Sequence, residues 1–312
     1  HARAVAGLTS SHEGSWLVSA DGAGDLRVWD ARSWADAARF KSNNKEPFFR
    51  VALSASARCI IGVRSSSLCA YACGERWTQQ AVLPVMVNPE TGEHSRWCCV
   101  AFSPAAVEVD DGCGVTGSDN LLAAASTTHL CVFDYSHGWS EDTPMRSHSI
   151  LRYTQTSCIT VMSCGAWVLT GHENGYVNVW NTYSLTLDRR IQAHDGLVTC
   201  LVASPLGARY GPRFASGGAD FQVCVWRGED WALEQGVLAS REAASDKALD
   251  IGRALGVEDD SDDDEVSSAC GGRHVDGSVG GTKPHDGGKR IDRGVSCLAF
   301  SRSGSWLVSV AK

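Results

Sequence analysis

A short strand-like pattern recurs along the chain at near-regular intervals, and this repeat constrains the fold more than any other feature. Four copies alternate in apolar character and close on an aromatic residue, and a weaker copy lies among them: Asp25–Asp30, Leu130–Asp134, Tyr176–Asn181, Gln222–Trp226 and the weaker Leu68–Tyr71. The aromatic residues at positions 29, 71, 133, 180 and 226 are separated by 42, 62, 47 and 46 residues. A period of about 40 to 45 residues indicates stacked supersecondary units, and the longest interval indicates an insertion.

The first half of each unit also recurs. One pattern is shared by Val5–Leu8, Val198–Leu201 and Val295–Ser301, and Val100–Pro104 matches the end of that pattern. A second pattern begins at Trp16, Trp167, Phe214 and Trp306. Each segment alternates with period two between Gly, Ser or Pro residues, which predicts a meander of short antiparallel strands. One four-stranded sheet cannot bury both of its faces, whereas sheets stacked in a ring bury them against one another. The sequence therefore predicts an all-β propeller.

The composition agrees with one large all-β domain. Apolar residues make up 43% of the 312 residues, which is enough for a packed core. The 32 glycines beside only 8 prolines favour many tight turns. Helical periodicity is weak, and only Ala243–Gly256 predicts a short helix.

The fifth unit, His194–Trp226, resembles a repeat of the WD40 family, because it holds a histidine, an apolar strand with Ser-Pro, then Ala-Ser-Gly, an aspartate and a tryptophan. The resemblance implies that His194, Ser216, Asp220 and Trp226 form a buried hydrogen-bonded chain. A fully satisfied network of this kind makes a blade rigid, and the loss of one member leaves the others without partners. Other units hold only part of the set: the first has His1, Ser19 and Trp29 with Ala23 at the acidic position, and the fourth has Thr170, Asn174 and Trp180 with Thr154 or Gln155 at the histidine position.

The resemblance also implies a blade count. Five units are whole, and a sixth is cut at Lys312 before its third strand; His1 likewise resembles the second residue of the family's Gly-His pair. Propellers of this family commonly close with seven blades. Residues 1–312 are therefore expected to form a single incomplete propeller, seven-bladed in the full protein, with five blades and a truncated sixth in this chain.

An acidic, glycine-rich segment separates the fifth and sixth units. No Phe, Trp or Tyr occurs between Trp231 and Phe300, and the gap contains the acidic run Glu258–Glu265. A segment with so little apolar area cannot offset its ordering entropy, so residues 242–292 are expected to be a disordered insertion between blades. Ser261 precedes acidic residues and is a candidate phosphorylation site; the alternative is a solvated spacer. A second acidic insertion is Ala105–Asn120.

Motifs for catalysis or cofactor binding are absent or only apparent. Gly112–Gly117 matches the dinucleotide pattern G-x-G-x-x-G, but it follows a loop and no helix comes after it, so a nucleotide site is not expected. Cys69 with Cys73, or His94 with Cys98 and Cys99, lack the four converging ligands that a zinc site needs, and these thiols are interpreted as core residues. The sequence therefore predicts no enzyme activity, metal or cofactor.

Charge and cysteine usage restrict the partners and the compartment. The net charge is −8, whereas a nucleic-acid-binding surface usually has clustered Lys and Arg. The 13 cysteines lie mostly in apolar runs, which is typical of small hydrophobic residues in a reducing compartment and not of a disulfide framework. No apolar stretch approaches the length of a membrane span. The sequence therefore predicts a cytoplasmic or nuclear protein with no membrane or nucleic-acid partner.

Five residues are candidates for contact with partner proteins. Arg96, Trp97, His172 and Glu173 fall in or beside predicted loops at one end of the propeller, and Trp and Arg are the residues that most often anchor interfaces. Trp97 also aligns with an apolar strand position, so a core role is the alternative. Arg32 closes the segment Trp29–Arg32, which matches the W-D-x-R signature of cullin-4 substrate receptors; an ordinary blade terminus is the alternative.

These observations favour a non-catalytic scaffold that presents loops to other proteins. A sharp first unit, two degraded units and two sharper ones resemble the arrangement in the G-protein β-subunit-like protein of the ASTRA assembly. That resemblance implies a subunit of an ASTRA-like assembly for kinase maturation or chromatin. The alternative is a substrate receptor of a cullin-4 ubiquitin ligase. An enzyme using the central channel and an RNA-associated ribosome-assembly factor are the less favoured classes.

Overall fold

The structure is a computed structural model of the chain. It describes all residues except 2, 12, 42–45, 88–91, 93, 104–120, 141, 144, 151–152, 206–210, 239–247, 251–293, 302–303 and 312. The predicted insertion 105–120, the acidic run and Ser261 therefore lie outside the described residues.

Every regular element in the described residues is a β-strand, which confirms the all-β prediction. The strands form successive antiparallel sheets, called blades one to six in chain order. Blade one contains β1 (Val5–Ser10), β2 (Trp16–Asp21), β3 (Asp25–Asp30) and β4 (Asp36–Lys41); blade two β5 (Arg50–Leu53), β6 (Cys59–Val63), β7 (Ser67–Cys73) and β8 (Trp77–Pro84); blade three β9 (Trp97–Phe102), β10 (Leu121–Ser126), β11 (His129–Asp134) and β12 (Met145–Ser149). Blade four contains β13 (Thr156–Val161), β14 (Trp167–His172), β15 (Tyr176–Asn181) and β16 (Leu187–Gln192); blade five β17 (Val198–Ala203), β18 (Arg213–Gly218), β19 (Gln222–Arg227) and β20 (Leu233–Leu238); blade six β21 (Ala248–Asp250), β22 (Val295–Phe300) and β23 (Trp306–Ala311).

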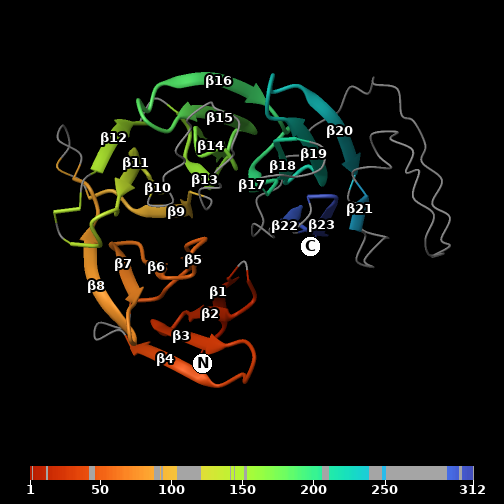
Figure 1. The fold of residues 1–312 in the computed structure, drawn as a ribbon. Helices are drawn as coiled ribbons and strands as arrows, with labels where there is room; N and C mark the ends of the chain where they lie inside the picture. The colour runs from red at the N-terminus through yellow and green to blue at the C-terminus, as the bar shows by residue number, and fades with distance from the viewer. Residues whose placement is uncertain are drawn as a thin grey trace, which may run out of the picture.

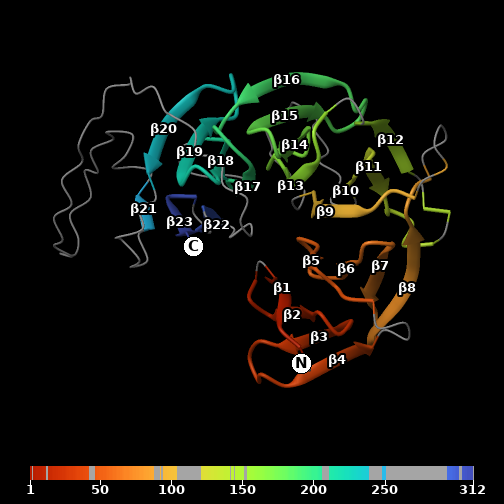
Figure 2. The ribbon, with the colours of Figure 1, turned by 180° about the vertical axis from the view of Figure 1, so that it is seen from behind.

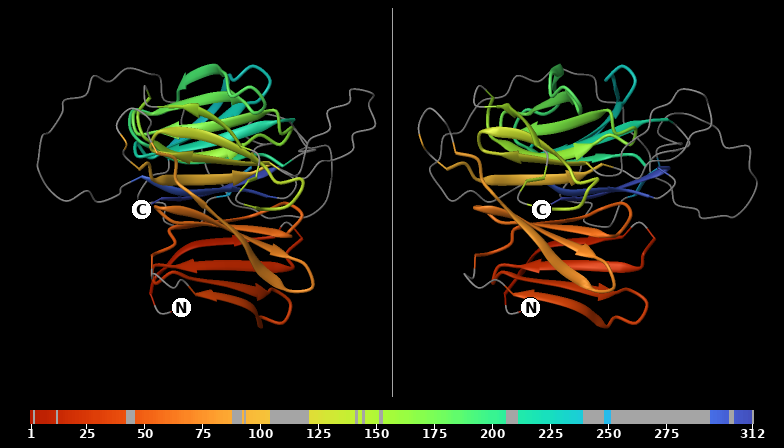
Figure 3. Two further views of the ribbon diagram at one scale, coloured as in Figure 1. Left: turned by 90° about the vertical axis from the view of Figure 1, so that its left-hand side faces the viewer. Right: turned by 60° about the vertical axis from the view of Figure 1, so that its left-hand side comes forward.

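Each complete blade is a four-stranded meander in which every strand pairs with its sequence neighbour. The blades follow one another around a common axis, with the first strand of each complete blade innermost and β22 innermost in blade six (Figures 1 and 2). Seen from the side, the sheets are stacked as layers (Figure 3). Because strand direction alternates, the turn between the second and third strands lies at the same end of the ring as the connector that enters each blade. This end is called the entry end.

Apolar side chains between neighbouring blades form the core. Each of the five hydrophobic clusters spans two adjacent blades; in the cluster between blades one and two, for example, Val18 and Val28 pack with Ile60 and Tyr71. All four of these side chains are at most 1% exposed. The prediction that stacked sheets bury one another's faces is therefore confirmed.

Among the described residues, the ring is open between blade one and blade six, and the two apolar faces there have no neighbouring sheet (Figures 1 and 2). On blade one, Val5 and Leu8 of β1 are exposed. On β23, alternate residues behave differently: Leu307 is buried against blade five, whereas Val308 and Val310 are exposed. The described part of the chain thus shows five complete blades and part of a sixth, and the seven-bladed ring stays a prediction.

Strand β21 departs from the expectation for residues 242–292. Ala248–Asp250 was expected to lie in a disordered insertion and within the one short helical pattern, but it pairs antiparallel with β23. Leu249 lies opposite Leu307, just as Trp29 lies opposite Leu17 in blade one, so β21 takes the place of a third strand. The physical reason is that the edge of β23 presents unpaired backbone groups, and an extended segment satisfies them.

Candidate functional site

The four residues implied by the family resemblance in blade five lie together in a hydrogen-bonded chain. The His194 ring contacts both oxygens of Asp220 through Nδ1 at 3.0 and 3.1 Å, and Ser216 Oγ through Nε2 at 2.8 Å. Trp226 Nε1 donates to Ser216 Oγ at 2.9 Å. Because the carboxylate accepts from Nδ1 and the indole fills one acceptor position of Ser216, the serine hydroxyl donates to Nε2. These hydrogen bonds join the connector that enters the blade to the turn after β18 and to strands β18 and β19.

The Asp220 carboxylate is held in its charged form. Burial acts to raise its pKa, but hydrogen bonds from the His194 ring and from the backbone N–H groups of Gln222 and Asp195 outweigh burial, and the net pKa is lowered. An ionised, fully hydrogen-bonded carboxylate fixes the turn that carries it. This carboxylate is committed to holding the blade together.

Blade one also has a complete network, but Asp21 rather than Ala23 supplies its carboxylate. His1 Nδ1 lies 3.0 Å from Asp21 Oδ2, His1 Nε2 lies 2.6 Å from Ser19 Oγ, and Trp29 Nε1 donates to Ser19 Oγ at 2.8 Å. Asp21 is the last residue of β2, two positions after Ser19, whereas the acidic residue of blade five lies in the turn. The expectation at Ala23 was wrong because the carboxylate can reach the histidine from the strand end as well.

The residue at the strand end explains the difference between the two blades. The position of Asp21 is occupied by Gly218 in blade five. A Cβ on Gly218 would lie 2.4 Å from both Asp220 Oδ1 and His194 Nδ1. Glycine therefore leaves the space that the turn aspartate fills, and an aspartate at the strand end makes the turn aspartate unnecessary.

Blade four forms its network with a third arrangement. His172 occupies the same strand-end position, and its Nε2 lies 2.9 Å from Thr170 Oγ1 and 3.0 Å from Asn178 Nδ2. Trp180 Nε1 donates to Thr170 Oγ1 at 2.9 Å. The ring's Nδ1 lies 2.8 Å from the carbonyl oxygen of Thr154. The histidine missing from the connector is therefore supplied by the strand.

His172 was expected to contact a partner, but it is 1% exposed and both of its ring nitrogens are hydrogen-bonded inside the blade. The Thr154 carbonyl can only accept, so Nδ1 carries the proton and Nε2 accepts from its two neighbours. Burial lowers the pKa of His172, which opposes the smaller effect of the hydrogen bond to Thr154. The ring is therefore neutral and structural, and it is not available at the surface.

Blades two and three replace the polar network with apolar packing. In blade two the serine position is Gly62, and a Cβ there would lie 2.5 Å from the ring of Phe48. The Arg64 guanidinium stacks over that ring at 4.2 Å. In blade three, Ala124 occupies the serine position and Phe133 the tryptophan position, and both are buried. Without a hydroxyl at this position, neither blade needs a histidine or a carboxylate to satisfy one.

Three other predicted contact residues are exposed, and one is buried. Arg96 and Glu173 are exposed at the entry end, in the connector before β9 and in the turn after β14. Arg32 is exposed at the opposite end, in the turn after β3. Trp97 is 2% exposed and packs 6.2 Å from Phe133 in the core between blades two and three, so the structure places it at the core position that was the alternative.

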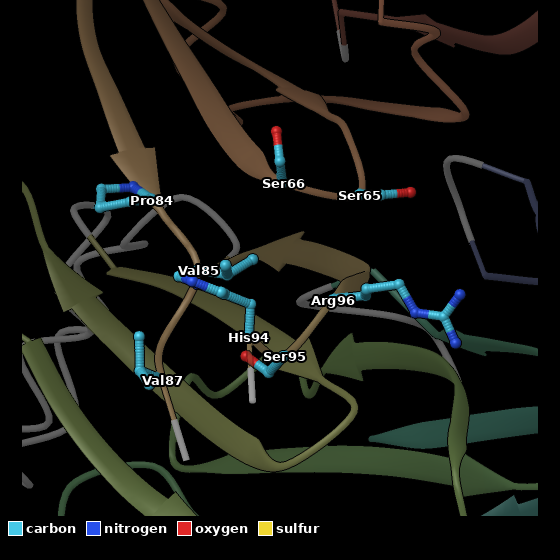
Figure 4. Close-up of a pocket in the computed structure, with 8 residues that line it drawn as sticks. All are labelled: Ser65, Ser66, Pro84, Val85, Val87, His94, Ser95 and Arg96. Carbon is cyan, nitrogen blue, oxygen red and sulfur yellow. The ribbon is translucent and has the colours of Figure 1, made fainter. Parts of the chain in front are cut away.

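A groove at the entry end between blades two and three collects residues that the sequence analysis mostly missed. It has a volume of about 580 Å³ and is lined by Ser65, Ser66, Pro84, Val85, Val87, His94, Ser95 and Arg96. The β6–β7 turn forms one wall, and the connector between β8 and β9 forms the other (Figure 4). The lining residues come from three segments with no shared motif. Only Arg96, beside a tryptophan in a predicted loop, gave a signal in the sequence.

Arg96, which lines the groove, and two charged residues outside its lining, Arg50 and Glu173, act on one thiol of β9. Burial raises the pKa of the Cys98 thiol on β9, while the positive charges of Arg96 and Arg50 oppose that rise and the charge of Glu173 adds to it. All three charges therefore reach the same thiol. Arg50 Nη2 also donates to the carbonyl oxygen of Ser157 in blade four at 3.1 Å.

The stacked four-stranded sheets define the chain as a β-propeller. The profile of the WD40 family, described as WD domain, G-beta repeat, matches residues 1–30, 185–227 and 285–312. The fold is similar to the β-propeller domain of Cps50 (Swd1) from Myceliophteria thermophila, with a TM-score of 0.59 and 13% sequence identity over 77% of this chain and 74% of that one. The chain therefore has the fold of a WD40-type β-propeller. No curated protein sequence matches the chain.

Two further findings concern membranes and metals. Within the described ranges, no helix is long and apolar enough to cross a membrane. The same ranges contain no cluster of three or more His, Cys, Asp or Glu side chains that could hold a metal ion. Cys69 and Cys99, which were weighed as ligands, are buried as free thiols.

Proposed function

We propose that this propeller is a non-catalytic scaffold that holds partner proteins on its entry end. One observation carries the proposal: in blades one, four and five, the histidine and hydroxyl side chains of the networks, and the aspartates of blades one and five, are buried or half-buried and are used for hydrogen bonds inside the blades. Arg96 and Glu173, by contrast, are exposed at the entry end, Arg96 in the connector before β9 and Glu173 in the turn after β14 of blade four. Loops on a rigid frame are suited to recognition, because little order is lost when they bind.

We also propose, at a finer level, that the chain acts as a subunit of an ASTRA-like assembly in kinase maturation or chromatin. The support is the order of blade types along the chain. Networks occur in blades one, four and five, and apolar packing replaces them in blades two and three. This order matches the resemblance described for the sequence. The expected partners are proteins of a multi-subunit complex in the cytoplasm or nucleus.

A second candidate function is that of a cullin-4 substrate receptor, and Arg32 is the observation that favours it. Arg32 is exposed, and its backbone N–H donates to Asp30 Oδ1 at 2.8 Å. Hydrogen bonds from the backbone N–H groups of Ser33 and Arg32 lower the pKa of Asp30, so the turn keeps a charged carboxylate. A fixed turn that presents a free arginine is a suitable docking point for an adaptor.

Affinity purification of the chain followed by mass spectrometry tests these functions. Chaperones of kinase maturation among the stable partners support the ASTRA-like role, and a cullin adaptor supports the second candidate. The Arg32→Gln variant separates the two, because it removes only an adaptor that docks at this turn. If no protein is retained, the scaffold proposal is rejected.

A further inference from the structure

We propose that the groove between blades two and three binds an extended peptide that carries one carboxylate side chain next to an apolar side chain. The inference rests on the proposed scaffold function and names the partner chemistry at one place on the entry end. The carboxylate would pair with Arg96, and the apolar side chain would cover Pro84, Val85 and Val87.

The outer part of the groove is apolar. Pro84 and Val87 are exposed, Val85 is half-buried, and Val87 is 47% exposed. Figure 4 shows Pro84, Val85 and Val87 along the part of the connector that leaves β8. Unlike the apolar faces at the open side of the ring, these residues lie between two blades that both have neighbours. The exposed apolar surface here therefore has a purpose other than blade stacking.

The inner part of the groove presents one free positive charge. In the described part of the chain, the Arg96 side chain forms no ion pair and no hydrogen bond. Its guanidinium points away from Val87, on the same side as the hydroxyl of Ser65 (Figure 4). A guanidinium binds a carboxylate through two parallel hydrogen bonds, which makes arginine the natural partner of a planar anion.

The surrounding charges favour a singly charged carboxylate over a phosphate. Arg50, the second cation near Cys98, already uses its Nη2 on the carbonyl of Ser157. The Glu173 carboxylate acts on the same thiol and adds a negative charge. A phosphate carries nearly two negative charges and needs more donors than one free guanidinium supplies. The local balance therefore fits one carboxylate.

The walls of the groove are fixed before a ligand arrives. The backbone N–H of Trp97 donates to the carbonyl oxygen of Ser65 at 3.1 Å, and the backbone N–H of Val85 donates to the carbonyl oxygen of Ser66 at 3.2 Å. The hydroxyl of Ser95 donates to the carbonyl of Met86 at 2.8 Å. These bonds tie both walls to the blades, so binding does not have to order them.

The test measures binding of fluorescent ten-residue synthetic peptides by polarisation. Each peptide has one leucine placed one to four residues from one glutamate in a Gly/Ser background, and matched sets carry glutamine, lysine or phosphoserine in place of the glutamate. The protein is the 312-residue chain, with the variants Arg96→Gln and Arg96→Glu. The control is Arg76→Gln, because Arg76 is an exposed arginine of blade two, in the β7–β8 turn at the opposite end.

The proposal expects the best glutamate peptide to bind at least about tenfold tighter than its glutamine counterpart. Arg96→Gln should remove this preference, Arg96→Glu should shift it to the lysine peptide, and Arg76→Gln should leave it unchanged. The proposal is overturned if no peptide binds, if only the phosphoserine peptides bind, or if the protein variants Arg96→Gln and Arg76→Gln bind the peptides alike. It is also overturned if binding requires replacement of Glu258–Glu265 by Gly/Ser, since the chain's own acidic run would then be the occupant.

The groove and the scaffold function can fail separately. If the Arg96→Gln chain retains the same partners in affinity purification as the unchanged chain, the scaffold stands and the groove is not its binding site. If the unchanged chain retains no partner at all, the scaffold proposal itself fails.

Discussion

From the hydrogen-bonded network of blade four, we predict how much the substitution Thr170→Val lowers the free energy of unfolding. Valine has nearly the shape of threonine, so it leaves no cavity, but it removes the hydroxyl that accepts from Trp180 Nε1 and bonds His172 Nε2. Trp180 is fully buried, so its N–H would lose its partner without gaining water. A buried unsatisfied donor costs about 1–3 kcal/mol, and the lost bond to His172 adds about 1 kcal/mol. We expect the free energy of unfolding to fall by about 2–4 kcal/mol, measured by urea denaturation at pH 7.5.

The matched control is Thr160→Val. Thr160 is half-buried on β13 of the same blade, and its side chain forms no hydrogen bond with any described residue, so its substitution should change stability by no more than about 0.5 kcal/mol. In the Thr170→Val background, Trp180→Phe should cost about 1–2 kcal/mol less than in the unchanged chain, because the orphaned N–H is then gone. Equal losses for the two threonine variants, or no coupling with Trp180, would refute the network argument.

Three further predictions concern pH, backbone conformation and thiol reactivity. Burial lowers the pKa of His172 in the folded chain. As pH falls below the ordinary value of about 6.5, the unfolded chain therefore takes up a proton first, and the free energy of unfolding decreases until the lowered pKa is reached. In His172→Gln, the free energy of unfolding in urea should depend less steeply on pH. Gly175→Ala should cost at least about 2 kcal/mol in urea denaturation, because φ is +84° and a Cβ would lie 2.0 Å from a backbone carbonyl oxygen, whereas Gly14→Ala, with φ +69° and open space, should cost about 1 kcal/mol. Burial raises the pKa of Cys158 to about 12, so iodoacetamide followed by peptide mass spectrometry should label exposed Cys297 first and leave Cys158 unlabelled; equal labelling would contradict the structure.

The repeat in the sequence was sufficient to predict the blades, because period-two alternation directly encodes which face of a strand is buried. Leu307 is buried and its neighbour Val308 is exposed, as a two-residue period requires. The same local logic could not find β21, since Ala248–Asp250 has no strand pattern of its own and is ordered by the free edge of β23.

The networks were predicted only where the chain follows the most common spacing. Asp21 was overlooked and His172 was assigned to partner contact, because a carboxylate or an imidazole can enter the network from the strand end and a linear pattern does not show which side chain reaches the space. The absence of a Cβ at Gly218 decides the outcome in blade five, and this is a three-dimensional property. The groove beside Arg96 was hidden for a similar reason, because its lining comes from separate segments.

Exposed tryptophans need a structural explanation before they are interpreted as binding residues. In three blades, a buried tryptophan at or near the connection between the third and fourth strands packs on the preceding blade. Trp77 meets Trp16 edge to face with centroids 6.0 Å apart, and Trp231 meets Trp167 in the same way at 5.8 Å. Trp139 Nε1 donates to Cys59 Sγ of blade two at 2.7 Å. This contact is a repeated junction between blades.

The open side of the ring leaves both halves of such a junction uncovered. Trp34 lies in the β3–β4 turn of blade one and is 67% exposed, while Trp306 begins β23 as Trp16 begins β2 and is 45% exposed. Each has the position of a residue that is covered where two blades meet. Trp34, beside Arg32, is therefore exposed because it lies at the open side of the ring, where its junction is uncovered. Its exposure adds no support for an adaptor site. The groove at Arg96 lies between two blades that both have neighbours, so its exposure does not depend on the open side of the ring. That difference makes the groove the better-founded place to look for a partner.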